Sequence, residues 1–78
     1  MSFKIIIPEQ LELRRRQYPI GTRVELCFMD DPYTKLRPGD KGTVTGVDDM
    51  GDIQVSWDTG STLKLIVGVD SFKVVRDE

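Results

Sequence analysis

Alternation of apolar and polar residues dominates the chain after Gly21 and predicts short, half-buried β-strands. The runs that follow this period of two are residues 23–28, 53–57, 62–65 and 72–75. Residues 41–47 are rich in Thr and Val, which favour extended structure, and their two glycines predict a bulge or bend. The inward positions of these strands predict a core made of Val24, Leu26, Phe28, Val44, Ile53, Val55, Trp57, Leu63, Leu65, Phe72 and Val74.

The first part of the chain has a different pattern and predicts one short helix over Pro8–Gln17. Proline suits a first helical turn, where its missing N–H costs nothing, and Pro19 ends the helix. Ile7, Leu11 and Tyr18 form one narrow apolar stripe. Because so short a helix is not stable in isolation, it must lean on the rest of the domain or on a partner.

Turn residues connect the predicted strands. Tight hairpin loops are predicted at 48–51 and 58–61, and the Pro-Gly pair within residues 37–40 predicts a type II turn. A chain of 78 residues allows one domain. Five short strands with tight turns and one longer loop predict an all-β fold, a small five-stranded SH3-like barrel. The barrel would span residues 18–78, after an N-terminal helical arm at residues 1–17 (the arm).

Several motifs resemble those of one known family. They include Tyr18-Pro19-Ile20-Gly21-Thr22-Arg23-Val24-Glu25-Leu26, Pro38-Gly39-Asp40-Lys41-Gly42-Thr43-Val44 and Ile53-Gln54-Val55-Ser56-Trp57-Asp58. Their combination is similar to a bacterial and phage family catalogued as domain of unknown function 4314, over about residues 18–75. The resemblance implies a bacterial or phage context, in some cases a mobile genetic element. It implies no reaction, cofactor or site residue.

Charge is unevenly distributed, although the net charge is only -2 at pH 7. Residues 1–20 carry four basic and two acidic side chains, and the rest of the chain carries seven basic and eleven acidic ones. A basic arm and an acidic body favour docking of one on the other, or on a second copy. We expect a monomer or weak homodimer.

The sequence also excludes several kinds of chemistry. It contains no histidine, which is the commonest general base and metal ligand, and a single cysteine cannot form an internal disulfide or a cysteine-based zinc site. No run approaches the length of a membrane span. We therefore expect a cytoplasmic, non-enzymatic protein with no cofactor, no metal and no membrane contact.

Acidic and aromatic residues in two loops form the candidate partner-binding site. These residues are Asp30, Asp31, Tyr33, Asp48 and Asp49. By analogy with SH3-like barrels, loop 29–40 and hairpin 48–52 would border one groove. Carboxylates around one aromatic ring suit a Lys- or Arg-bearing peptide. The alternatives are that the aspartates only shape the hairpin turn and that Tyr33 folds back to cap the barrel.

Two simpler interpretations apply to the remaining reactive side chains. The aspartates at 48, 49 and 52 lack the regular spacing and distant Glu of a calcium loop, and exposed loop carboxylates have no reason to share a proton. Cys27 alternates with core positions, so we expect it to face outward or lie at a seam as a small, semi-apolar residue.

Arg14, Arg15 and Arg16 are the candidate nucleic-acid contacts. Three consecutive helical positions spread over about 200° of arc, so they cannot all face one phosphate backbone. The acidic body opposes a phosphate backbone as well. The leading hypothesis is thus a binding module that recognises a protein or peptide through its loop rim. The alternative is a DNA- or RNA-associated accessory protein of a mobile element that uses the arm.

Overall fold

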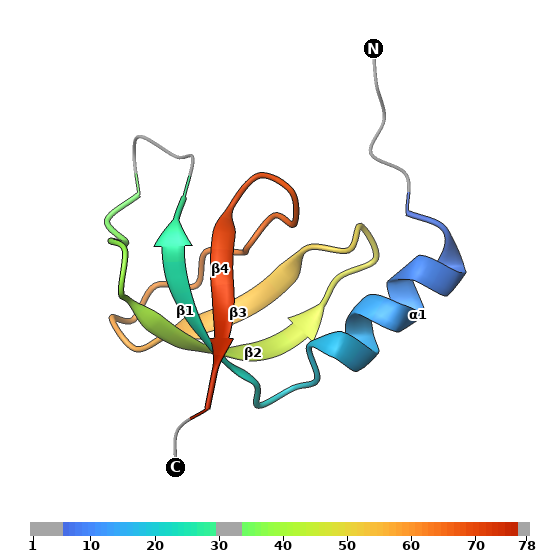
Figure 1. The fold of residues 1–78 in the computed structure, drawn as a ribbon, viewed down its shortest axis with the longest axis horizontal. Helices are drawn as coiled ribbons and strands as arrows, with labels where there is room; N and C mark the ends of the chain where they lie inside the picture. Colours follow the sequence, from blue (N-terminus) through green and yellow to red (C-terminus); the bar gives the residue numbers. More distant parts are fainter. Residues whose placement is uncertain (1–5, 30–33, 77–78) are drawn as a thin grey trace.

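The computed structural model describes residues 6–29 and 34–76, and these form one helix and four strands (Figure 1). They are α1 (Pro8–Gln17), β1 (Arg23–Phe28), β2 (Lys41–Val47), β3 (Ile53–Trp57) and β4 (Ser71–Val75). The strands make one antiparallel sheet in the order β3-β2-β1-β4. The domain is therefore mostly β, an open four-stranded sheet with one short helix. Within the described ranges, no helix has the length and apolar character that crossing a membrane requires.

The fifth strand predicted at 62–65 is reduced to a single bridge between Ile53 and Leu65. Side chains satisfy the backbone of Leu63 in place of a strand ladder. The indole Nε1 of Trp57 donates to the Leu63 carbonyl at 2.8 Å, and the Leu63 N–H donates to the Ser61 hydroxyl at 3.3 Å. The sheet stays open at this end, and the predicted five-stranded barrel is not confirmed.

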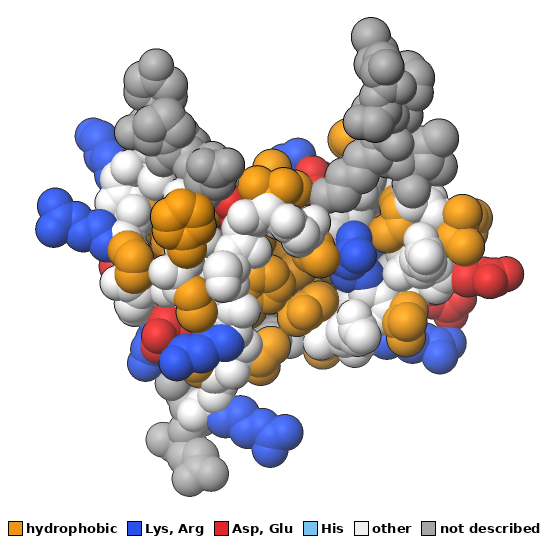
Figure 2. Space-filling model, turned by 45° about the horizontal axis from the view of Figure 1, so that its top comes forward, with side chains coloured by type: hydrophobic (Ala, Val, Ile, Leu, Met, Phe, Trp, Pro, Cys, Tyr) orange, Lys and Arg blue, Asp and Glu red, His pale blue; other side chains and the backbone are white. Residues whose placement is uncertain are grey.

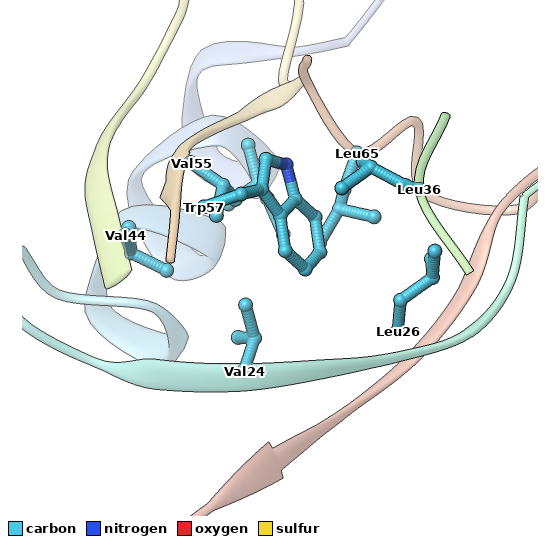
Figure 3. Packing of buried hydrophobic residues seen from close by; sticks show 8 residues of the cluster. Val24, Leu26, Leu36, Val44, Val55, Trp57 and Leu65 are labelled. Carbon is cyan, nitrogen blue, oxygen red and sulfur yellow. The ribbon is translucent and has the colours of Figure 1, made fainter. Parts of the chain in front are cut away.

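The core lies between the curled sheet and the segments that follow β1 and β3. Seven of the predicted core residues are buried, and Figure 3 shows Trp57 in the middle of them. Leu36, from the loop between β1 and β2, is also buried, with 7% of its surface exposed, and was not predicted. The residues at the centre of the core are therefore Val24, Leu26, Leu36, Val44, Ile53, Val55, Trp57 and Leu65.

Three predicted core residues are exposed instead, and a bulge explains the first of them. Leu26 lies opposite Phe72, but Phe28 lies opposite Ser71, so β1 has one extra residue at this point. The extra residue reverses the alternation of faces, and Phe28 is 57% exposed. Cys27 is exposed, as predicted.

The other two lie at the margins of the sheet. Leu63 belongs to the predicted strand that did not form, and it is 38% exposed. Val74 lies on the edge strand β4 and is 48% exposed. The irregularity predicted within β2 is confirmed, because the register with β3 shifts between Val44 and Gly46.

Helix α1 lies beside β2 and the hairpin that joins β2 to β3 (Figure 1). The helix has the predicted bounds, but none of its residues is buried. Arginines hold it: Arg14 Nη1 donates to the Gly51 carbonyl at 3.1 Å, and Arg15 donates to the Val47 carbonyl at 3.3 Å. Tyr18, just after the helix, packs on Phe72 with ring centroids 5.5 Å apart. Hydrogen bonds from Arg14 and Arg15 therefore attach α1 to the sheet, and Tyr18 is the residue of the predicted apolar stripe that packs against the core.

Removal of residues 1–17 is expected to lower the melting temperature by several degrees. The deletion removes the arginine bonds to the hairpin, and about 1 kcal/mol shifts the melting temperature of a domain this small by roughly 4–8 °C. Differential scanning calorimetry would measure the shift, with Arg16→Ala as a control because, among the described residues, Arg16 bonds to Glu12 alone, within the helix. An unchanged melting curve for the deletion would show that the arm adds nothing to stability.

Candidate functional site

An open groove of about 370 Å³ lies where the ends of several loops meet. Its lining combines four apolar side chains with three charged ones: Met29, Leu63, Ile66, Val69, Asp52, Lys64 and Asp70. Apolar side chains are exposed together near the centre of the view in Figure 2. Within the groove, Val69 is 51% exposed and Ile66 is 38% exposed. The groove therefore offers apolar surface to a ligand beside carboxylates.

A tight turn before β4 presents the apolar part of the groove. The Ile66 N–H donates to Asp70 Oδ2 at 2.8 Å, and the Asp70 N–H donates to the Ile66 carbonyl at 2.8 Å. Gly68, between them, has a φ of 91°, a conformation that favours glycine. The turn thus fixes Ile66 and Val69 without burying either of them.

The hairpin between β2 and β3 forms another wall, and Asp48 organises it. Its Oδ1 accepts the backbone N–H groups of Met50 at 3.0 Å and of Asp52 at 2.9 Å. Its Oδ2 accepts a hydrogen bond from Lys64 Nζ at 3.0 Å. Asp48 therefore joins the hairpin to the segment after β3 and fixes two lining residues, Asp52 and Lys64.

These contacts lower the pKa of Asp48. Partial burial is the largest single influence and raises the pKa, but it is outweighed by the hydrogen bond from Lys64, the two backbone hydrogen bonds and the charge of Lys64. A lowered pKa in the folded state means that the ionised carboxylate stabilises the fold. This stabilisation is complete above the unfolded pKa, about 3.9, and is lost as the pH falls through the folded pKa.

Asp48→Ala is expected to lower the free energy of unfolding by about 1–3 kcal/mol at pH 7, because it leaves two backbone N–H groups and Lys64 without this acceptor. The difference from the parent protein should shrink as the pH falls below about 4. Urea unfolding at several pH values would measure both effects. Asp49→Ala is the matched control, since that side chain is 99% exposed. A stability difference that grows in acid would contradict this role of Asp48.

A second carboxylate with a lowered pKa lies away from the groove. Asp58 accepts two hydrogen bonds from Arg23, at 2.8 and 2.6 Å, and these lower its pKa against the effect of partial desolvation. Arg23 also donates to the Thr43 hydroxyl at 3.0 Å. Because this ion pair ties the start of β1 to the end of β3, we assign it a structural role.

The predicted partner-binding residues are only partly placed by the structure. Asp30, Asp31 and Tyr33 lie outside the described residues. Asp48 and Asp49 lie in the hairpin. The Asp48 carboxylate accepts the hydrogen bonds from the hairpin backbone and Lys64 described above. Asp49 Oδ1 accepts a hydrogen bond from Arg15 at 3.2 Å. The two segments predicted to border one groove do approach each other, because Met29 and Asp52 line the same one.

The three arginines of the arm point to different partners. Arg14 and Arg15 bond to the hairpin, and Arg16 Nη2 lies 2.8 Å from Glu12 Oε1. Arg15 and Arg16 keep 48% and 75% of their side-chain surface exposed. The structure therefore gives each of them a contact within the protein and does not gather them into one phosphate-binding cluster.

The apolar residues of the groove, Ile66 and Val69, were not among the predicted site residues. The alternation of polar and apolar residues breaks down at 66–69, where three apolar residues surround one glycine. Apolar residues in a short exposed turn are the signal that could have marked them. In the described ranges, no three His, Cys, Asp or Glu side chains gather closely enough to hold a metal ion.

An open antiparallel sheet, a helix attached by arginines and an apolar groove beside carboxylates define a small, mostly β domain with a surface site. The family model described as Domain of unknown function (DUF4314) matches residues 7–75, and the chain belongs to that family. The match includes residues 7–17 and therefore covers α1. No curated protein and no solved structure is significantly similar to the chain.

Proposed function

We propose that this domain is a non-enzymatic binding module that takes a Lys- or Arg-bearing, partly apolar peptide segment of a partner protein in its groove. The observation that carries the proposal is the composition of the groove, where exposed Ile66 and Val69 lie beside Asp52 and Asp70. Apolar contacts supply affinity, and a few charged groups orient the ligand.

The charge of the groove supports a basic ligand. Two carboxylates and one ammonium group belong to its lining, and the ammonium group of Lys64 is bound to Asp48. The lining is therefore net negative. Residues 21–78, which surround it, have the same sign, with eleven acidic against seven basic side chains. A basic segment is attracted to this field, and a phosphate backbone is repelled by it.

The arrangement of the strands supports a relation to SH3-like barrels. We propose that the sheet is an open form of such a barrel, in which the segment 61–65 takes the place of the fifth strand beside β3. The backbone bonds between Trp57 and Ser61 and between Ile53 and Leu65 support this reading. A bacterial or phage mobile element, with the domain in the cytoplasm, is the setting that we propose from the family resemblance.

Backbone amide NMR signals of the labelled full chain, titrated with a peptide of alternating Lys and Leu, test this function. We expect shifts at Asp52, Ile66 and Val69, and no shifts on the outer face of the arm. A peptide of alternating Glu and Leu is the control for charge. Duplex DNA should produce at most weak shifts at Arg14 to Arg16. Micromolar DNA affinity that falls steeply with salt, together with an inert groove, would contradict the proposal and favour the nucleic-acid alternative.

A further inference from the structure

The two edge strands of the sheet, β3 and β4, differ in how their outward-facing backbone groups are hydrogen-bonded. Beyond β3, the chain returns and bonds to it: the Trp57 N–H donates to the Ser61 carbonyl at 2.9 Å, and Ile53 and Leu65 exchange bonds of 2.9 and 2.8 Å. Strand β4 is the edge strand on the opposite side of the sheet. Among the described residues, its strand neighbour is β1 alone (Figure 1). The outer edge of β4 is thus an edge at which another strand can be added.

The direction of the backbone groups in β1 decides which groups of β4 face outward. The Leu26 N–H donates to the Asp40 carbonyl, and the Gly39 N–H donates to the Leu26 carbonyl, both at 2.8 Å. Both bonds lie on the β2 side of β1. Because this direction alternates along an antiparallel strand, the backbone groups of Glu25 point to the other side, towards β4.

Glu25 lies directly opposite Lys73 in the register of the two strands. The backbone groups of Lys73 therefore point inward to β1, and those of its neighbours, Phe72 and Val74, point away from the sheet. In the part of the chain that the structure describes, no other backbone group bonds to them on that side. The N–H and C=O groups of Phe72 and Val74 therefore face outward, with the spacing that an added antiparallel strand needs for its hydrogen bonds.

The inner neighbour of β4 shows which side chains complement it. Residues 24–26 of β1 have the order apolar, acidic, apolar, and they lie opposite residues 72–74 of β4, which have the order apolar, basic, apolar. Lys73 Nζ lies 3.5 Å from Glu25 Oε2 and keeps 60% of its side-chain surface exposed. Val74 is 48% exposed. A second strand with the order apolar, acidic, apolar could therefore pair with residues 72–74 on the outer side of β4, as residues 24–26 do on the inner side.

We propose that an extended segment of a partner protein with the order apolar, acidic, apolar adds to the free edge of β4 as an antiparallel strand. Its acidic residue lies opposite Lys73, and its two apolar residues lie opposite Phe72 and Val74. Backbone hydrogen bonds supply affinity, and the alternate side chains supply specificity. Pairing with a second copy centred on Lys73 would place two lysines opposite each other, which is unfavourable. No residue of β4 lines the groove, so this surface is separate from that of the proposed function.

A peptide with the sequence Thr-Val-Glu-Leu-Thr and one with Lys in place of Glu test the proposal on the labelled full chain. With the first peptide, we expect the amide signals of Phe72 and Val74 to shift and their hydrogen exchange to slow. Lys73→Glu should weaken binding of the first peptide by about fivefold or more and strengthen binding of the second. Failure of this charge exchange would overturn the proposal.

Two variants separate the edge from other surfaces. Val74→Pro removes an outward N–H and should abolish binding, while the fold persists because an edge strand tolerates proline at such a position. If that variant does not fold, the charge exchange at Lys73 still decides the question. Val69→Ser, in the groove, should leave binding of this peptide unchanged, so that failure here and failure of the groove are distinguishable. Shifts confined to the groove, or a dimer that protects the same amides without peptide, would contradict the proposal.

Discussion

Trp57→Ala is expected to lower the free energy of unfolding by about 3–5 kcal/mol, which is enough to unfold most of a small domain. The side chain is 2% exposed, lies in the middle of the core, and holds the Leu63 carbonyl through its indole Nε1 (Figure 3). The substitution thus leaves a cavity and also releases the segment that carries the groove. Urea unfolding followed by circular dichroism would measure the loss.

Phe28→Ala is the matched control for this experiment. Both aromatic residues have the sequence pattern of inward positions, but Phe28 is 57% exposed. Its removal should change the free energy of unfolding by no more than about 0.5 kcal/mol, as for most surface substitutions. Equal losses for the two variants would show that Trp57 is not the centre of the core.

Gly42→Ala is expected to lower the free energy of unfolding by about 1–3 kcal/mol through overpacking. A Cβ atom at this buried position of β2 would lie 2.5 Å from Val55 Cγ1 and 3.0 Å from both the Ser56 carbonyl and Trp57 Cε3. The Val55 methyl group could move, but the backbone carbonyl and the packed indole could do so only by displacing β3.

Gly46→Ala, on the same strand, controls for the change in backbone entropy. A Cβ atom there would have an ordinary contact of 3.4 Å with the Gln54 side chain. We expect the melting temperature of this variant to stay close to that of the parent, whereas that of Gly42→Ala should fall by several degrees. A larger loss for Gly46→Ala than for Gly42→Ala would contradict the packing of β2 on β3.

Much of the fold could be predicted because local patterns determined it. The helix has its predicted bounds, since Pro8 and Pro19 limit it. The strict alternation of residues 53–57 predicted both β3 and the buried position of Trp57. The irregularity in β2 was visible as glycines in a run of Thr and Val. In each case, the signal lies within a few neighbouring residues.

The errors arose where contacts distant in sequence overrode the local pattern. One extra residue opposite Ser71 turned Phe28 outward, and a register shift of this kind is not visible in β1 alone. Residues 62–65 have the alternation of a strand, but bonds from the side chains of Trp57 and Ser61 replaced its ladder. Leu36 completes the core from a loop, where no period exists to reveal it.

The candidate site was predicted less well than the fold. Analogy with SH3-like barrels, rather than the sequence itself, predicted that loop 29–40 and hairpin 48–52 would border one groove; Met29 and Asp52 line the same groove. The sequence did not indicate that Asp48 is engaged by the hairpin backbone and Lys64, because those bonds depend on the hairpin geometry and on a residue 16 positions away. The apolar side chains of the turn at 66–69 were missed although their signal is local, a run of apolar residues around Gly68.

The affinity of the Lys-Leu peptide for three forms of the protein, measured by isothermal titration calorimetry, tests the proposed function most directly. Val69→Ser removes apolar surface from the groove, and Leu13→Ser removes an apolar side chain of similar exposure from the arm. We expect Val69→Ser to weaken binding by about tenfold, which corresponds to about 1.4 kcal/mol, and Leu13→Ser to leave it unchanged. Equal affinity for the parent and Val69→Ser, or a loss in Leu13→Ser alone, would contradict the groove as the binding site.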